Sequence, residues 1–160
     1  MAQAVKTNAM RILEKAKIDY SVFTYDSDEF LDGVTVAGMV NKPVETVFKT
    51  LLTVGAGNNV YVFVIPVAAT LDMKAAARAV SEKSVSMLPV AKITAVSGYI
   101  KGGCSPIGMK KQYATVIDES ARDLKLITFS AGKRGMQLET SPEDLAKVVG
   151  ATFTAVIEKD

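Results

Sequence analysis

The middle of the chain carries the sequence GYIKGGCSPIGMKKQYATVIDES at residues 98–120. Its composition predicts a short strand that ends at Ile100 or Lys101, a glycine-rich loop that runs through Gly108, and a buried strand over residues 113–117. We expect the rest of the chain to be arranged around this loop, because it joins backbone that can bend sharply to a strand suited to a core.

Gly102 and Gly103 lie at the centre of this loop. Because glycine has no Cβ, the backbone here can adopt positive φ and bring its N–H groups close to a bound oxyanion or phosphate. The alternative is an ordinary tight turn followed by Pro106. Both interpretations remain open at this point.

The composition is typical of a soluble globular protein, with 49% hydrophobic and 22% charged residues among 160. This length predicts a single domain over residues 1–160. No run of residues reaches the roughly 18 apolar positions of a membrane span, and the N-terminal residues lack a signal-peptide core, so we expect a cytoplasmic protein without a membrane partner. The formal net charge of +2 indicates no particular partner.

The sequence contains no histidine and one cysteine, Cys104. It therefore excludes a Ser-His or Cys-His nucleophile, an imidazole base and histidine or thiolate metal sites, and we expect neither a metal nor a cofactor. Cys104 lacks a base to activate it, so we interpret it as a small packing residue in a reducing compartment. Any chemistry has to use backbone donors, lysine, tyrosine, hydroxyls, carboxylates, water or the substrate itself.

Apolar periodicity and turn residues predict the remaining elements. We expect helices at 4–17, 32–40, 73–80, 89–96 and 141–150, a loop at 26–29, and strands at 20–25, 46–54, 60–67, 84–87, 126–129, 136–139 and 151–157. The strands at 46–54 and 60–67 should form a hairpin, and Asp72 and Ser141 should cap helices. This order favours an α+β fold with a mixed, largely antiparallel, curled and barrel-like sheet and flanking helices.

Lys49 stands out because strand alternation places it on one face with Val47 and Leu51. It is either a solvated lysine whose stem covers apolar surface, or a charge in a lined pocket that binds a phosphate, a ribose hydroxyl or a carboxylate. Tyr25 could likewise donate a hydrogen bond in a cleft, or pack its ring and leave its hydroxyl in water.

A second polar loop, SAGKRG at residues 130–135, resembles the first in composition. Each combines small residues with a basic pair, and if both faced one cleft they would form a backbone cradle rimmed by four cations, which suits a polyanion. The alternative is that these pairs, Lys110 with Lys111 and Lys133 with Arg134, belong to ordinary solvated turns.

Five motifs together identify a known pattern: VFKTLL at 47–52, LDMK at 71–74, the glycine-rich segment at 94–111, TVIDES at 115–120 and SAGKRG at 130–135. Their order and spacing resemble the YbaK/EbsC family of aminoacyl-tRNA deacylases, from the first helix to the last strand. The resemblance implies a trans-editing enzyme that hydrolyses the ester between a wrong amino acid and the tRNA 3′ adenosine. It also implies the fold of the editing insert of bacterial prolyl-tRNA synthetase.

The resemblance further implies roles for individual residues, with Lys49, Gly102 and Gly103 as catalytic residues and Tyr25, Ser130 and Gly132 as substrate-binding residues. We hypothesise that the two glycine amides hold the ester carbonyl, that Lys49 anchors the terminal ribose or phosphate, and that the four basic residues of the two loops bind the acceptor stem. The implied substrate is Cys-tRNA(Pro), with Cys-tRNA(Cys) as a further candidate, and the implied partner is prolyl-tRNA synthetase. The substrate's own thiol would attack its carbonyl.

Three departures from the family pattern leave the preferred amino acid open: Cys104 in place of an aliphatic residue, Ala131 in place of glycine and Gln137 in place of an acid. One alternative is an Ala-tRNA(Pro) deacylase, in which water attacks. Another is a non-catalytic module that binds tRNA ends or a synthetase surface.

Overall fold

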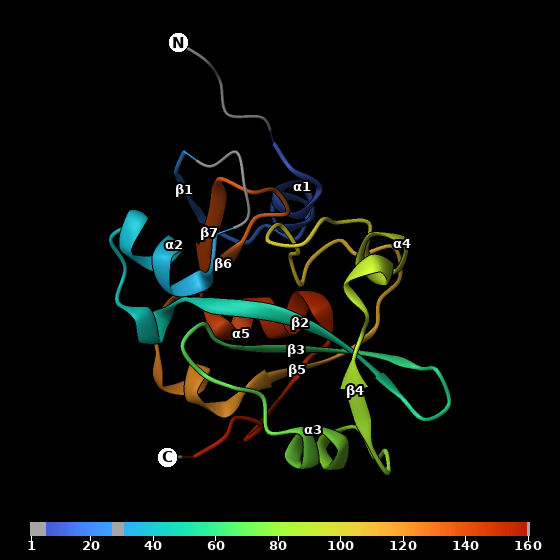
Figure 1. Ribbon diagram of the computed structural model, residues 1–160. Helices are drawn as coiled ribbons and strands as arrows, with labels where there is room; N and C mark the ends of the chain where they lie inside the picture. Colours follow the sequence, from blue (N-terminus) through green and yellow to red (C-terminus); the bar gives the residue numbers. More distant parts are fainter. Residues whose placement is uncertain (1–5, 27–30, 160) are drawn as a thin grey trace.

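A central hairpin organises the larger of two sheets in the computed structural model, which describes residues 6–26 and 31–159 (Figure 1). The hairpin consists of β2 (Phe48–Gly55) and β3 (Val60–Pro66). The sheet has the strand order β4-β2-β3-β5-β8, in which β4 is Val85–Met87, β5 is Ala114–Asp118 and β8 is Thr152–Thr154. β3 pairs with β5, and β5 with β8, in parallel, so the sheet is mixed.

The smaller sheet is antiparallel and has the order β1-β7-β6, formed by Ser21–Thr24, Met136–Thr140 and Ile127–Ser130. A parallel bridge between Val47 and Thr128 joins it to the start of β2. The α+β class with mixed strands and flanking helices is therefore confirmed. The described strands form two sheets and do not close into a barrel.

The helices are α1 (Asn8–Lys15), α2 (Gly33–Met39), α3 (Met73–Ala79), α4 (Ile93–Ser97) and α5 (Pro142–Val149), with 3-10 turns at Val44–Thr46, Val90–Lys92 and Glu119–Asp123. Two predicted caps are confirmed. Asp72 accepts hydrogen bonds from the amides that open α3, and Ser141 accepts one from Asp144 at 3.1 Å. No helix within 6–26 and 31–159 has the length and apolar character to cross a bilayer. The predicted loop at 26–29 lies largely outside the described residues, as do residues 4 and 5 of the first predicted helix.

Alternation along β3 divides the core into two clusters. Val62 and Val64 pack between the two sheets with residues of α1 and α5, whereas Phe63 and Ile65 pack against α3 on the other face. All four side chains are 1% exposed or less. The larger sheet is therefore covered on both faces, with α5 and α3 on opposite sides (Figure 1).

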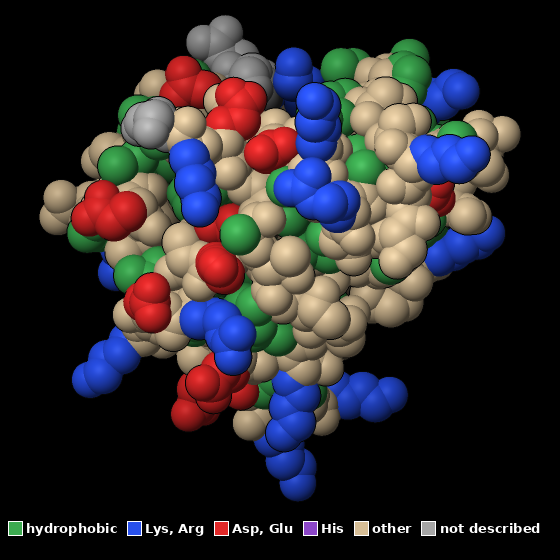
Figure 2. All heavy atoms as spheres, turned by 90° about the horizontal axis from the view of Figure 1, so that it is seen from below, with side chains coloured by type: hydrophobic (Ala, Val, Ile, Leu, Met, Phe, Trp, Pro, Cys, Tyr) green, Lys and Arg blue, Asp and Glu red, His purple; other side chains and the backbone are tan. Residues whose placement is uncertain are grey.

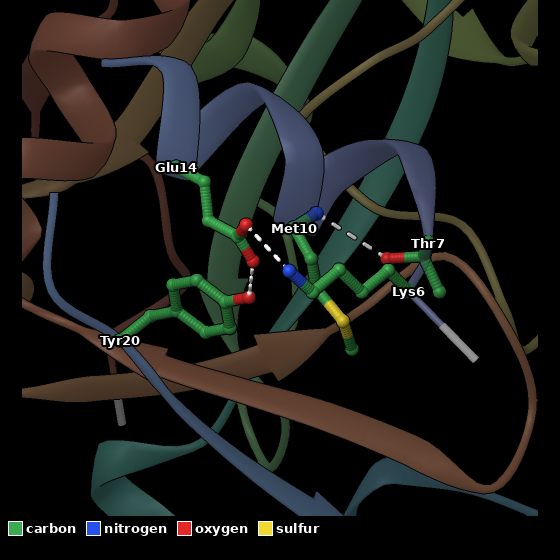
Figure 3. Close-up of polar contacts among 5 residues, drawn as sticks. All are labelled: Lys6, Thr7, Met10, Glu14 and Tyr20. Carbon is green, nitrogen blue, oxygen red and sulfur yellow. Dashed lines mark hydrogen bonds and ion pairs between the residues drawn. The ribbon is translucent and has the colours of Figure 1, made fainter. Parts of the chain in front are cut away.

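A carboxylate on α1 ties this helix to the start of the smaller sheet (Figure 3). Glu14 accepts a hydrogen bond from Lys6 Nζ at 2.7 Å and another from the Tyr20 hydroxyl. Burial and the neighbouring Glu14 carboxylate raise the pKa of Tyr20 to about 12, so its hydroxyl stays protonated and keeps donating at neutral pH. The contact fixes the connection between α1 and β1.

Two sequence-based predictions near the loops were wrong. Residues 98–101 form no strand, because Gly98 ends α4 with φ of +87° and the Ser97 hydroxyl then accepts the Tyr99 amide at 3.0 Å. The last predicted strand is also shorter than expected, since β8 ends at Thr154.

The segment after β8 leaves the ladder to contact the body of the protein. The Val156 amide donates to the buried Asp118 carboxylate at 3.0 Å, and the Val156 carbonyl accepts the Asp72 amide at 2.8 Å. A further bridge pairs Leu71 with Ile157. This segment therefore connects the end of β5 to the start of α3.

Leu138 on β7 is fully buried in the core between the sheets, whereas Leu126 is 47% exposed. We expect Leu138→Ala to lower the free energy of unfolding by about 2–5 kcal/mol, because it removes buried methyl groups and leaves a cavity. The same change at Leu126 should stay within about 0.5 kcal/mol. Urea unfolding of the two variants measures the difference, and equal losses would contradict this placement of the core.

Candidate functional site

A pocket of about 450 Å³ lies along an unpaired edge of β2. β4 pairs with β2 only over Thr53–Gly55, so the preceding residues of β2 have a strand partner on the β3 side alone. The pocket is bounded by β2, by α2, by the end of β4 and the segment that follows it, by the adjoining ends of β6 and β7, and by Lys101, Gly102 and Cys104. The site therefore forms where the larger sheet stops pairing and loops take over.

Lys49 lines this pocket from β2 and is half-buried. Burial lowers the pKa of its ammonium, since desolvation disfavours the charged form. Within the part of the chain that the structure describes, its Nζ makes no hydrogen bond or ion pair. A cation in this position is suited to bind an anionic or electron-rich ligand group.

The glycine-rich loop enters the pocket through a tight turn. The Gly103 amide donates to the Ile100 carbonyl at 2.9 Å, and Gly102 occupies the third position of the turn with φ of +86°. This φ is typical of glycine in a type II turn. Gly102 lines the pocket, and its amide has no acceptor among the described residues. Within the described residues, the Gly102 N–H group is thus available to a ligand in the pocket.

Gly103 lies behind the pocket rather than in its lining. A Cβ at this position would lie 3.1 Å from the Arg134 amide nitrogen and 3.3 Å from Lys133 Cα. A side chain here would require these backbone atoms to shift by a few tenths of an ångström, and backbone moves less easily than a flexible side chain, so glycine favours this close approach of the two loops. The amide of Gly103 is already used within the turn, so the two glycines are not equivalent.

Two further predicted residues line the same pocket, Tyr25 and Ser130. The Tyr25 amide donates to the Gly135 carbonyl at 2.9 Å, which holds the end of β1 against the second loop. Ser130 Oγ accepts the Gly132 amide at 3.2 Å. Gly132 itself lies outside the lining, where a Cβ would meet the Tyr99 ring at 2.9 Å.

The predicted basic rim does not line the pocket. Lys110, Lys111 and Lys133 are exposed, and none of these three lines it. Arg134 is half-buried and donates from Nε to the Lys101 carbonyl at 2.9 Å. On the face seen in Figure 2, basic side chains are dispersed among acidic ones rather than gathered into one patch.

Sequence reasoning missed several lining residues, of which Gln137 is the most notable. It is 6% exposed and lines the pocket, and among the described residues nothing accepts from or donates to its carboxamide. The hairpin register places it opposite Ser130 and, on the other side, opposite Phe23. The pairing of Gln137 with Ser130 could have been predicted from the short loop between the two strands, because a hairpin loop fixes which residues face each other.

Cys104 and Thr50 also belong to the polar part of the lining, as do Asp32 and Lys101. Burial raises the pKa of the Cys104 thiol to about 11, so it is protonated at neutral pH and poorly suited to act as a nucleophile. Thr50 Oγ1 is buried without a hydrogen-bond partner within residues 6–26 and 31–159. The exposed apolar side chains of Val34, Met87 and Val90 lie at the same pocket.

Comparison with known proteins places these features in a family context. The family model described as "Aminoacyl-tRNA editing domain" matches residues 33–148. An Enterococcus faecalis protein named "Putative Cys-tRNA(Pro)/Cys-tRNA(Cys) deacylase EbsC" is 42% identical over 156 residues, which cover 97% of this chain and 95% of that protein.

Two solved structures share the fold. One, titled "Crystal structure of hypothetical protein APE2540", superimposes with a TM-score of 0.83 at 20% identity and covers 92% of this chain and 97% of that one. The other, titled "Crystal structure of a putative trans-editing enzyme for prolyl tRNA synthetase", gives a TM-score of 0.81 at 19% identity and covers 96% and 99%.

The desolvated ammonium of Lys49 should cost stability. Because its pKa is lower in the folded protein than in the unfolded chain, the unfolded chain binds more protons between the two pKa values, and stability rises with pH across that window. We expect Lys49→Met to have a higher urea midpoint than the wild type at pH 7. The difference should shrink as the pH rises from the pKa of Lys49 in the folded protein towards that of free lysine, because the wild type gains stability across this range.

The matched control is Lys111→Met, which removes an exposed lysine outside the pocket. Its urea midpoint should follow that of the wild type at every pH. A Lys49→Met protein that is less stable than the wild type at pH 7 would show that the ammonium has a stabilising partner.

Proposed function

Because the chain belongs to the aminoacyl-tRNA editing domain family, we propose that it deacylates mischarged tRNA in trans, with Cys-tRNA(Pro) as the main substrate and Cys-tRNA(Cys) as a further one. The observation that carries this proposal is the meeting of Lys49 and the Gly102 amide in one pocket. An aminoacyl ester is already activated, so a site without histidine can cleave it by positioning the ester and stabilising the oxyanion.

In this proposal Gly102 is the oxyanion donor. Its N–H has no acceptor in the described residues and would donate to the ester carbonyl oxygen as negative charge develops there. Gly103 has a different part from the one expected from the sequence, since its amide is engaged with Ile100 and its missing Cβ lets the loops meet. We therefore assign one amide, not two, to the carbonyl.

Lys49 would anchor the terminal ribose or its phosphate, because its ammonium lacks a partner within the described chain and lines the pocket. Tyr25 and Ser130 would contact the aminoacyl-adenosine from the ends of β1 and β6.

The acceptor stem would bind outside the pocket. Its phosphates would contact the exposed Lys110, Lys111 and Lys133, so tRNA binding should weaken as the salt concentration rises.

For a cysteinyl ester the substrate supplies the nucleophile. Its thiol sulfur forms a bond to the carbonyl carbon, the bond from that carbon to the ribose oxygen breaks, and the thiol proton passes to the departing ribose oxygen. The products are a cyclic thioester and uncharged tRNA. This route suits a pocket whose own thiol, Cys104, stays protonated at neutral pH because burial raises its pKa to about 11.

In this proposal the pocket of about 450 Å³ would hold only the aminoacyl end of the tRNA, so the pocket itself would make no contact with the anticodon. Discrimination between tRNAs therefore has to come from elsewhere, and prolyl-tRNA synthetase is the partner we propose to deliver the charged tRNA. Such a partnership fits the cytoplasmic location expected from the sequence.

Substitution of the two central groups tests the proposal. Gly102→Ala places a side chain at φ of +86° and displaces the amide, so kcat for Cys-tRNA(Pro) should fall about 10² to 10³-fold, as for loss of an oxyanion donor. Lys49→Ala should nearly abolish activity. Gly57→Ala in the β2–β3 loop has no positive φ and no close neighbour, so it serves as a control that should remain active.

The same assay should include tRNA(Pro) charged with cysteine, alanine and serine. Faster loss of cysteine than of serine supports thiol attack, whereas preferential loss of alanine favours the Ala-tRNA(Pro) alternative with water as nucleophile. If the protein retards tRNA on a gel but leaves every ester intact, it is a binding module and the proposal fails.

A further inference from the structure

Resting on the proposed function, we propose that Arg134 is a positioning residue that aims and polarises the Gly102 amide. Arg134 Nε donates to the Lys101 carbonyl at 2.9 Å. The Lys101 carbonyl and the Gly102 N–H belong to the same peptide group, so a bond to one end of this group fixes the direction of the other. The sequence suggested a different role for Arg134, namely contact with tRNA phosphates.

The geometry of the peptide group carries the first step. In a trans peptide the C=O and N–H bonds point in opposite directions, and the described residues contain no cis bond. Lys101 and Gly102 line the pocket, whereas Arg134 does not. Holding the carbonyl towards Arg134 therefore directs the amide away from Arg134, on the side where the pocket lies.

The charge of Arg134 carries the second step. A hydrogen bond from a guanidinium is charge-assisted and roughly twice as strong as one between neutral groups. It draws electron density towards the carbonyl oxygen and leaves the N–H of the same peptide a better donor. In the described chain no carboxylate forms an ion pair with Arg134, so its charge is not neutralised locally.

The rigidity of the second loop carries the third step. Arg134 lies in the tight connection between β6 and β7, which is closed by a hydrogen bond from the Ala131 amide to the Met136 carbonyl at 3.1 Å. The Arg134 backbone also lies against Gly103. The hairpin thus restricts the position of the guanidinium, and the hydrogen bond to the Lys101 carbonyl restricts in turn the motion of the turn that contains Gly102.

Two substitutions separate positioning from phosphate binding. Gln has its side-chain NH₂ group at the place of Arg Nε, so Arg134→Gln can keep the bond to Lys101 without the charge. Arg134→Met keeps the stem and removes the donor. We expect Arg134→Met to lower kcat for Cys-tRNA(Pro) roughly 10-fold to 100-fold, a smaller loss than that expected for removal of the oxyanion donor itself. The kcat of Arg134→Gln should be about tenfold higher than that of Arg134→Met. Arg78→Met, an exposed change on α3, is the matched control and should retain wild-type kcat.

Phosphate binding predicts another result. If Arg134 contacts tRNA, both variants should raise KM equally and reduce the salt dependence of binding, as Lys133→Met should, while kcat stays unchanged. That result overturns the inference.

An activity-independent measurement keeps this inference separate from the proposed function. The Gly102 amide resonance should shift and exchange faster with solvent in Arg134→Met. It should shift less in Arg134→Gln, which can keep the hydrogen bond to Lys101 but lacks the charge. An unmoved resonance in Arg134→Met overturns the positioning role even if the enzyme is active. A shifted resonance supports it even if no mischarged tRNA is cleaved, in which case only the proposed function fails.

Discussion

The backbone of Gly103 packs directly against the backbone of Lys133 and Arg134, and the rest of the site depends on this contact. One loop follows α4 and the other joins β6 to β7 in the smaller sheet, so the contact links two parts of the fold that are far apart in sequence. It places Gly102 beside the edge of β2, where pairing with β4 has ended. A Cβ at position 103 would require a shift of a few tenths of an ångström in main-chain atoms of Lys133 and Arg134, which would alter the spacing of the two loops.

The pocket combines groups that do little for stability. Lys49 carries a desolvated charge without a partner in the described chain, and Thr50 and Gln137 offer polar atoms without one. Burial of such groups costs free energy unless a ligand satisfies them. Two buried hydroxyls elsewhere in the described chain, those of Ser120 and Thr128, also lack a partner. Lys49, Thr50 and Gln137 differ from them because all three line this one pocket, as the polar groups of a binding site do. The fold tolerates this because both faces of the larger sheet are packed.

Much of the fold could be predicted from the sequence because local signals agree with tertiary packing. The β-branched and aromatic residues at 46–54 and 60–67, the cap at Asp72 and the cap with proline at Ser141 are local signals that predict their elements. Lys49 could be singled out because alternation places it among apolar neighbours.

The structure of residues 98–101 could not be predicted from their composition. Tyr99 and Ile100 are typical of a strand, but the positive φ of Gly98 and the hydrogen bond from the Tyr99 amide to the Ser97 hydroxyl turn the backbone away from a strand. The unequal roles of Gly102 and Gly103, and the lining position of Gln137, depend on a turn hydrogen bond and on strand register that composition does not reveal.

The segment after β8 has a consequence for the order of events during synthesis. β8 extends the larger sheet in parallel, and Val156 then bonds to both Asp118 and the start of α3. Asp118 and Asp72 precede Val156 by many residues. The nascent chain therefore cannot add β8 to the sheet or form the bond between Val156 and the start of α3 until the C-terminal segment has left the ribosome. The parallel edge of β5 stays open during that time and is available to other chains, so this edge is exposed to misassembly until the C-terminal segment has been synthesised.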